Sequence, residues 1–188
     1  VKALTSNKAK FTAKLCQMVK LIKNGNQLKM SKRSGDFITL EEMVNEVGAD
    51  SIRFMMLNRS NDVEIDFDFD KVKEKTKDNP VFYVQYAYAR INSLLRILDT
   101  SFVKEIEFDE VNFQLNEMEE KIIRKVFEWP KIIESASRKF DLHKIPFYLY
   151  ELSTLFHAYW SKGNEDKKYK FIENERIKRK EILATINL

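Results

Sequence analysis

The strongest helix signal in this sequence is the stretch DNPVFYVQYAYAR at residues 78–90. Asp78 or Asn79 can cap the helix, and Pro80 then falls in the first turn, where its missing N–H loses no helical hydrogen bond. The apolar residues that follow recur at helical spacing. They are Val84, Ala87, Tyr88, Ile91, Leu95 and Leu98. A helix that buries this stripe is therefore predicted from residue 79 onward.

The rest of the C-terminal sequence also has helical periodicity. Residues 117–139 form one stretch, which Pro130 should kink or divide because proline cannot donate the internal hydrogen bond. Residues 145–161 form another, which we expect to end at Gly163-Asn164. A last helix is expected from about Lys168. The sequence thus predicts a mainly α fold with a helical bundle.

Before these helices, an apolar run at residues 15–22 is followed by an Asn-Gly pair. This pair between two such runs is typical of a β-hairpin, since both residues tolerate the positive φ of its turn. We expect strands at about 15–22 and 27–30, with the turn at 23–26. A loop, KMSKRSGD at residues 29–36, should follow, with Gly35 as its flexible point.

Two short helices and a connector are predicted between the loop and the bundle. Thr39 and Glu42 form a capping box for the first helix, which should end near Gly48, and Asp50 is the expected N-cap of the second. Residues 58–70 are interpreted as a connector. Apolar and acidic residues alternate there, so a strand is the alternative, but no partner of matching pattern lies nearby.

The composition limits the class of protein. The 188 residues are 44% hydrophobic, enough for one moderate core and a smaller appendage. No stretch approaches the roughly eighteen consecutive apolar residues of a membrane span, so no membrane partner is expected. Cys16 is the single cysteine, which excludes an intrachain disulfide and, with two histidines, makes a zinc site improbable. We expect a cytoplasmic protein.

The charge is unevenly distributed. Residues 1–40 carry nine lysines and arginines against one acid, whereas residues 62–70 carry five acids and no base. The basic stretch would suit a polyphosphate partner such as ATP or a nucleic acid. A lysine-rich, solvated surface explains it equally well.

The pentapeptide KMSKR at residues 29–33 has the composition of a phosphate-binding loop. Its two lysines can donate to phosphate oxygens as charge builds up during phosphate displacement, and its serine and backbone N–H groups add neutral donors. On composition alone, a solvated basic turn is the commoner explanation. The run resembles the KMSKS signature of class I aminoacyl-tRNA synthetases at four of five positions. Arg33 replaces the final serine, as is common in the arginyl branch.

The resemblance continues over residues 14–188. GADSIR at 48–53 is similar to the GxDALR stretch of the DALR anticodon-binding domain, and residues 78–90 resemble the arginyl branch in particular. Residues 142–160 are similar to that family's helical C-terminal domain. The chain therefore resembles the C-terminal part of an arginyl-tRNA synthetase, with residues 1–72 from the catalytic domain and residues 73–188 as the DALR domain.

This resemblance implies roles for the loop. Lys32 is expected to be catalytic by stabilising the pyrophosphate leaving group, and the ATP-binding residues are expected to be Lys29, Met30, Ser31, Lys32 and Arg33. ATP, with Mg²⁺ in the full enzyme, would be a substrate, and no tightly bound cofactor or metal is expected here. Because the HIGH motif and the arginine pocket are absent from this sequence, we expect a fragment that is inactive alone. Members of the family usually run on past the equivalent of Leu188, so we also expect the DALR domain to be truncated at its C-terminus.

The resemblance also implies binding of tRNA(Arg), with arginine and ATP as further partners of a monomeric full enzyme. Tyr83, Tyr86 and Arg90 share one flank of the predicted helix and could stack on bases and contact phosphates. The alternative is a flank buried against another part of the protein. Phe156 and Trp160, one turn apart, could lie near the anticodon loop or simply fill the core, with Trp160 as the expected exposed member.

Two other functions stay open from the sequence. The chain could be a stand-alone RNA-binding module, since it has no HIGH motif. It could also be the DALR domain of a cysteinyl or methionyl enzyme, although residues 79–90 argue against that. His143 and His157 are interpreted as hydrogen-bonded structural residues.

Overall fold

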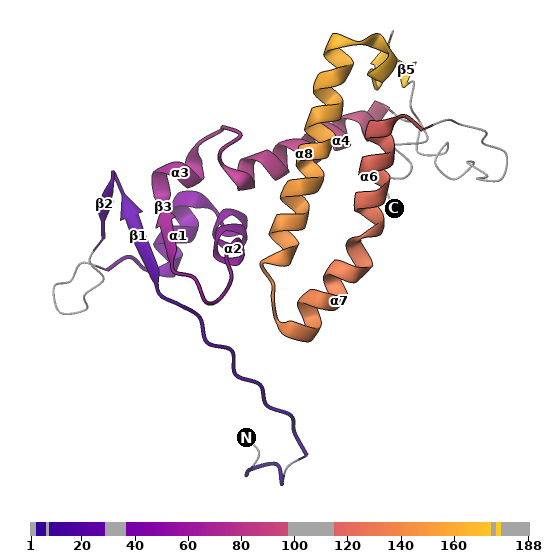
Figure 1. Ribbon diagram of the computed structural model, residues 1–188. Helices are drawn as coiled ribbons and strands as arrows, with labels where there is room; N and C mark the ends of the chain where they lie inside the picture. Colours follow the sequence, from indigo (N-terminus) through magenta and orange to yellow (C-terminus); the bar gives the residue numbers. More distant parts are fainter. Residues whose placement is uncertain (1–2, 7, 29–36, 98–114, 174–175, 178–188) are drawn as a thin grey trace.

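The computed structural model describes residues 3–6, 8–28, 37–97, 115–173 and 176–177 (Figure 1). The elements in chain order are β1 (Val19–Lys23), β2 (Asn26–Gln27), α1 (Leu40–Val47), α2 (Ala49–Leu57), β3 (Ile65–Asp68), α3 (Phe69–Lys73), α4 (Pro80–Ile97), α6 (Glu117–Phe127), α7 (Trp129–Lys139), α8 (Lys144–Glu165), the 3-10 turn η2 (Lys167–Tyr169), β4 (Ile172–Glu173) and β5 (Arg176–Ile177). We call β1–β3 with α1–α3 the sheet part, and α4–α8 with the segment after them the helical part. The prediction of a mainly α fold is confirmed.

The sheet part contains the predicted hairpin. β1 and β2 pair antiparallel, with Lys23 opposite Asn26, so that Asn24 and Gly25 form a two-residue turn. Both turn residues have positive φ, 50° and 70°, as a type I′ turn requires. β1 begins later than predicted, because the exposed residues before Val19 make no ladder of their own, and residues 29–30 of the second predicted strand lie outside the described residues.

The interpretation of residues 58–70 as a connector is wrong for part of that range. Ile65–Asp68 form β3, which pairs parallel to β1 with Val19 opposite Ile65, giving the strand order β2-β1-β3. The partner was missed because it lies more than forty residues earlier in the chain, and a parallel pair needs such a crossover. Phe67 and Phe69 are fully buried beneath α1 and α2.

Helices α1 and α2 follow the predicted capping box but differ at their junction. Thr39 accepts from the Glu42 backbone N–H and Glu42 accepts from Thr39, which confirms the capping box. Asp50 is not the N-cap of α2, because Gly48 is both the C-cap of α1 and the N-cap of α2. A φ of 83° at Gly48 makes this turn possible and leaves Asp50 inside the first turn.

The helical part is built around α8, which packs against α4, α6 and α7 (Figure 1). The predicted division near Pro130 is confirmed, since α6 ends at Phe127 and α7 begins at Trp129. Its core is a second buried cluster, separate from that of the sheet part. The cluster consists of Ala87, Leu94, Ile122, Phe156, Tyr159 and Phe171.

Two expectations for the C-terminal segment are wrong. Gly163 does not end α8, which continues to Glu165; instead, the Tyr169 carbonyl approaches so closely that a Cβ at residue 163 would lie 2.9 Å from it. From Lys168 the chain forms η2, β4 and β5 rather than a helix. Burial of Phe171 against α8 folds the chain back and interrupts the expected helix. Residues 178–188 lie outside the described part.

Candidate nucleic-acid interface

The loop that carries the phosphate-binding prediction is not among the described residues. Lys29, Met30, Ser31, Lys32 and Arg33 all fall in the range 29–36, so their predicted roles rest on the sequence. The structure places only the hairpin that precedes them, which ends with β2 at Gln27.

The predicted RNA-binding flank of α4 is brought together around Arg90. Its guanidinium donates to the Tyr86 hydroxyl at 2.7 Å and lies 4.1 Å from the centre of the Tyr86 ring. It also lies 4.8 Å from the centre of the Trp160 ring on α8. Tyr86 is 41% exposed, and both Arg90 and Trp160 are half-buried. These three residues, which we call the Arg90 cluster, unite predicted positions that lie seventy residues apart.

His157 holds Arg90 in place through a hydrogen bond. Its Nε2 lies 3.0 Å from the Tyr83 carbonyl, which can only accept, so Nε2 carries the proton and Nδ1 accepts from Arg90 at 3.1 Å. Burial lowers the pKa of the His157 imidazole, and the nearby positive charge of Arg90 lowers it further, while the hydrogen bond to Tyr83 opposes the shift. The neutral ring therefore holds Arg90, and the structural interpretation of His157 is confirmed.

The other predicted positions divide between surface and core. Phe156 is 2% exposed and packs inside the helical core, so its ring is not available for stacking on a base in this structure. Tyr83 is half-buried, with its ring 4.4 Å from His157 and 5.3 Å from Tyr150. Its contribution to this surface is its carbonyl, which orients His157.

Two neighbours of the Arg90 cluster were missed from the sequence. Phe82 stacks on Tyr86 at 5.7 Å, and its i, i+4 spacing was the available signal. Tyr150 on α8 is 37% exposed beside Tyr83, and nothing in the linear sequence connects the two. The interface therefore draws on two helices.

The arrangement can bind an anionic or aromatic ligand. The Arg90 guanidinium has more N–H groups than its partners Tyr86 and His157 use, and phosphate oxygens accept from such groups. Tyr and Trp rings at the surface can stack on unpaired bases. Within the described ranges, no group of three His, Cys, Asp or Glu side chains could hold a metal ion. Among those same residues, no helix is long and apolar enough to cross a membrane.

A known family matches the part of the chain that contains this surface. The model of the DALR anticodon binding domain matches residues 84–187. The chain belongs to the DALR anticodon binding domain family. The match includes Tyr86, Arg90 and Trp160, so the Arg90 cluster lies within the DALR domain.

Similar proteins extend the likeness over the sheet part as well. An arginine–tRNA ligase from Pelagibacter ubique is 52% identical over 176 residues, covering 94% of this chain and 30% of that protein. One from Rhizobium leguminosarum is 44% identical and covers all of this chain and 32% of its own length. The chain thus spans about a third of the length of the curated relatives it matches.

Solved structures give the same result for the fold. A Campylobacter jejuni chain assigned as an arginyl-tRNA synthetase superposes with a TM-score of 0.70 at 28% identity, covering 91% of this chain and 36% of that one. The Thermus thermophilus arginyl-tRNA synthetase, at 19% identity and a TM-score of 0.57, shares the fold. Both parts of the DALR-containing chain are therefore found together in known structures.

Proposed function

We propose that this chain is the tRNA-binding part of an arginine–tRNA ligase, and that its DALR domain binds tRNA(Arg) through the Arg90 cluster. The observation that carries this proposal is the 52% identity to an arginine–tRNA ligase over nearly the whole chain. The family match over residues 84–187 supports an anticodon-binding role for the helical part. In the complete enzyme the reaction joins arginine to tRNA at the expense of ATP.

Residues 29–33 supply the second half of the proposed function. In KMSKR, Lys32 stabilises the pyrophosphate leaving group, and Lys29, Met30, Ser31 and Arg33 complete the contacts to ATP, which enters with Mg²⁺. The relatives' identity across the hairpin and the following helices supports this assignment. Because the chain spans about a third of the length of its curated relatives, we expect it to bind tRNA without charging it when alone. The enzyme is cytoplasmic and acts as a monomer in this proposal.

The surface contacts of the Arg90 cluster explain how tRNA would bind. Arg90 is held by Tyr86 and His157, so little side-chain entropy remains to be lost when it meets a phosphate. Trp160 also contacts Arg90, so an aromatic ring lies beside the guanidinium. A splayed anticodon base and its phosphate fit such a pairing of ring and cation.

Filter binding of the 188-residue chain to tRNA(Arg) and to other tRNAs, across salt concentrations, tests the proposal. We expect a preference for tRNA(Arg) and weaker binding at high salt. Tyr86→Ala should weaken tRNA(Arg) binding by about tenfold, since a stacking or hydrogen-bonding ring is lost. Tyr88→Ala is the matched control, because Tyr88 is an exposed tyrosine on α4 outside the Arg90 cluster. Equal effects of the two variants, or no preference among tRNAs, would contradict the proposal.

A further inference from the structure

Asn79 joins the sheet part to the helical part through both ends of its amide. It is 5% exposed and lies between α3 and α4. Its Nδ2 donates to the carbonyls of Val72 and Glu74, each at 2.8 Å. Its Oδ1 accepts from the backbone N–H of Val81 at 3.1 Å and of Phe82 at 3.5 Å. One buried side chain thus fastens the end of α3 to the beginning of α4.

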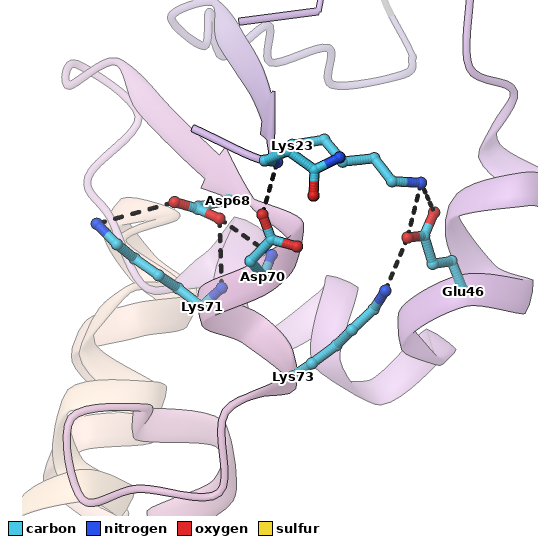
Figure 2. Close-up of polar contacts among 7 residues, drawn as sticks. Lys23, Glu46, Asp68, Asp70, Lys71 and Lys73 are labelled. Atoms are coloured by element: carbon cyan, nitrogen blue, oxygen red, sulfur yellow. Dashed lines mark hydrogen bonds and ion pairs between the residues drawn. The ribbon is translucent and has the colours of Figure 1, made fainter. Parts of the chain in front are cut away.

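On the sheet side, α3 is tied to the hairpin (Figure 2). Asp70 accepts from the backbone N–H of Asn24, in the hairpin turn, at 2.6 Å. Glu46 on α1 accepts from Lys23 at 2.9 Å and from Lys73 at 2.7 Å, so one carboxylate joins the end of β1 to the end of α3. These contacts, together with the pairing of β1 with β3, tie the position of the hairpin to that of α3.

On the helical side, α4 carries Tyr86 and Arg90, and Arg90 is bonded to His157 of α8. Helix α2 of the sheet part contacts both α4 and α8, and Lys14, before β1, donates to the Lys139 carbonyl and to Asp141 on the helical side. These contacts lie away from the α3–α4 junction. The Asn79 amide adds a fixed point at that junction itself.

We propose that Asn79 is a positioning residue that fixes the orientation of the tRNA-binding helices relative to the hairpin before residue 29. The role needs a side chain that donates toward α3 and accepts from α4 at the same time. An aspartate of equal size only accepts, so Asn79→Asp keeps the cap of α4 and loses both bonds to α3. The functional consequence of this inference rests on the proposed function, whereas its geometrical core does not.

The first test measures the orientation directly in the 188-residue chain. Cys16 is exposed and sits next to β1, where Gln17 bonds to Asn61, so it can carry one spin label; Ser161→Cys on the exposed side of α8 carries the other. Asn79→Asp should shift or broaden the distance distribution between the two labels. Asn116→Asp is the matched control, because the Asn116 side chain caps α6 through accepted bonds and donates to no partner among the described residues. An unchanged distribution in Asn79→Asp overturns the proposal.

The second test measures turnover in the complete protein that carries this chain. Misplacing the hairpin should lower the kcat of arginylation by about tenfold to a hundredfold while the Kd for tRNA stays within about twofold. Asp70→Ala should lower kcat in the same way, and Asp70→Asn, which can still accept from Asn24, should restore it. Loss of thermal stability with an unchanged kcat would show a merely structural role. If the wild-type protein charges no tRNA, the proposed function is wrong. The distances between the spin labels would still test the positioning role of Asn79.

Discussion

Glu46 in the sheet part and Glu119 in the helical part are acidic residues in opposite environments. In the sheet part, Glu46 meets Lys23 and Lys73 at the surface, where the lysine side chains remain 36% and 44% exposed. In the helical part, Glu119 is 0% exposed and accepts from the Tyr159 hydroxyl at 2.6 Å. Water and salt reach the first arrangement and not the second.

This difference indicates where the stability of each part resides. Exposed ion pairs contribute about 0–1 kcal/mol, since solvent screens them and ordering long side chains has an entropic cost. The surface pairs therefore orient α1, α3 and the hairpin, while the apolar cluster around Phe67 and Phe69 holds them together. In the helical part, buried polar groups belong to the core itself, so packing and hydrogen bonding cannot be separated.

The largest expected effect comes from removing a side chain from the apolar core of the sheet part. Phe67→Ala empties a fully buried site whose ring lies edge-on to Phe69 at 5.2 Å, and should destabilise the protein by about 3–5 kcal/mol. Urea unfolding measures this change. Phe37→Ala, at a residue that is 50% exposed, should change stability by less than about 1 kcal/mol. A loss under about 1 kcal/mol for Phe67→Ala would mean that the ion pairs, not the core, hold the sheet part.

The next largest effect tests a buried polar group of the helical part by a change of pH. Because burial lowers the pKa of His157, the unfolded chain binds a proton at a higher pH than the folded protein does. The stability due to neutral His157 is therefore present above about pH 6.5, the ordinary pKa, and is lost as pH falls through the lower folded value. Urea unfolding between pH 7.5 and about 5 should show this slope.

His157→Gln supplies the control for that slope. Glutamine can still donate to the Tyr83 carbonyl but does not titrate, so the variant should lose the dependence on pH between 7.5 and 5 that the wild type shows. The Arg90 contact would weaken at every pH. Parallel pH profiles for the two proteins would mean that folding does not change the pKa of His157.

Local signals in the sequence predicted local structure well. The Asn24-Gly25 turn, the Thr39–Glu42 capping box and the break at Pro130 each depend on a few adjacent residues, and all three are confirmed. What could not be predicted depends on distant partners. Pairing of β3 with β1 and the close approach of Tyr169 to Gly163 are tertiary contacts, and both overrode the local pattern.

The same division applies to the candidate site. Helical spacing placed Tyr83, Tyr86 and Arg90 on one flank of α4, and the structure agrees. Phe156 and Trp160 both contact Phe171, which comes from a segment predicted to be helical, so this part of their surroundings could not be predicted from the sequence. The role of Asn79 was half predicted, because capping was evident in the sequence and its bonds to Val72 and Glu74 were not.

The smallest expected effect concerns the exposed ion pairs of Glu46 in the sheet part. Hydrogen bonds from Lys73 and Lys23 lower the pKa of Glu46, so the stability it contributes is present above its ordinary pKa and lost as pH falls through the lower folded value. At pH 7 and low salt, Glu46→Gln should destabilise by about 0.2–1 kcal/mol, and 1 M NaCl should remove most of that difference. Glu41→Gln, on the same helix and with no ion pair among the described residues, should show neither effect. A difference that persists in high salt would place Glu46 with the buried groups of the helical part, since only a pair shielded from solvent resists screening.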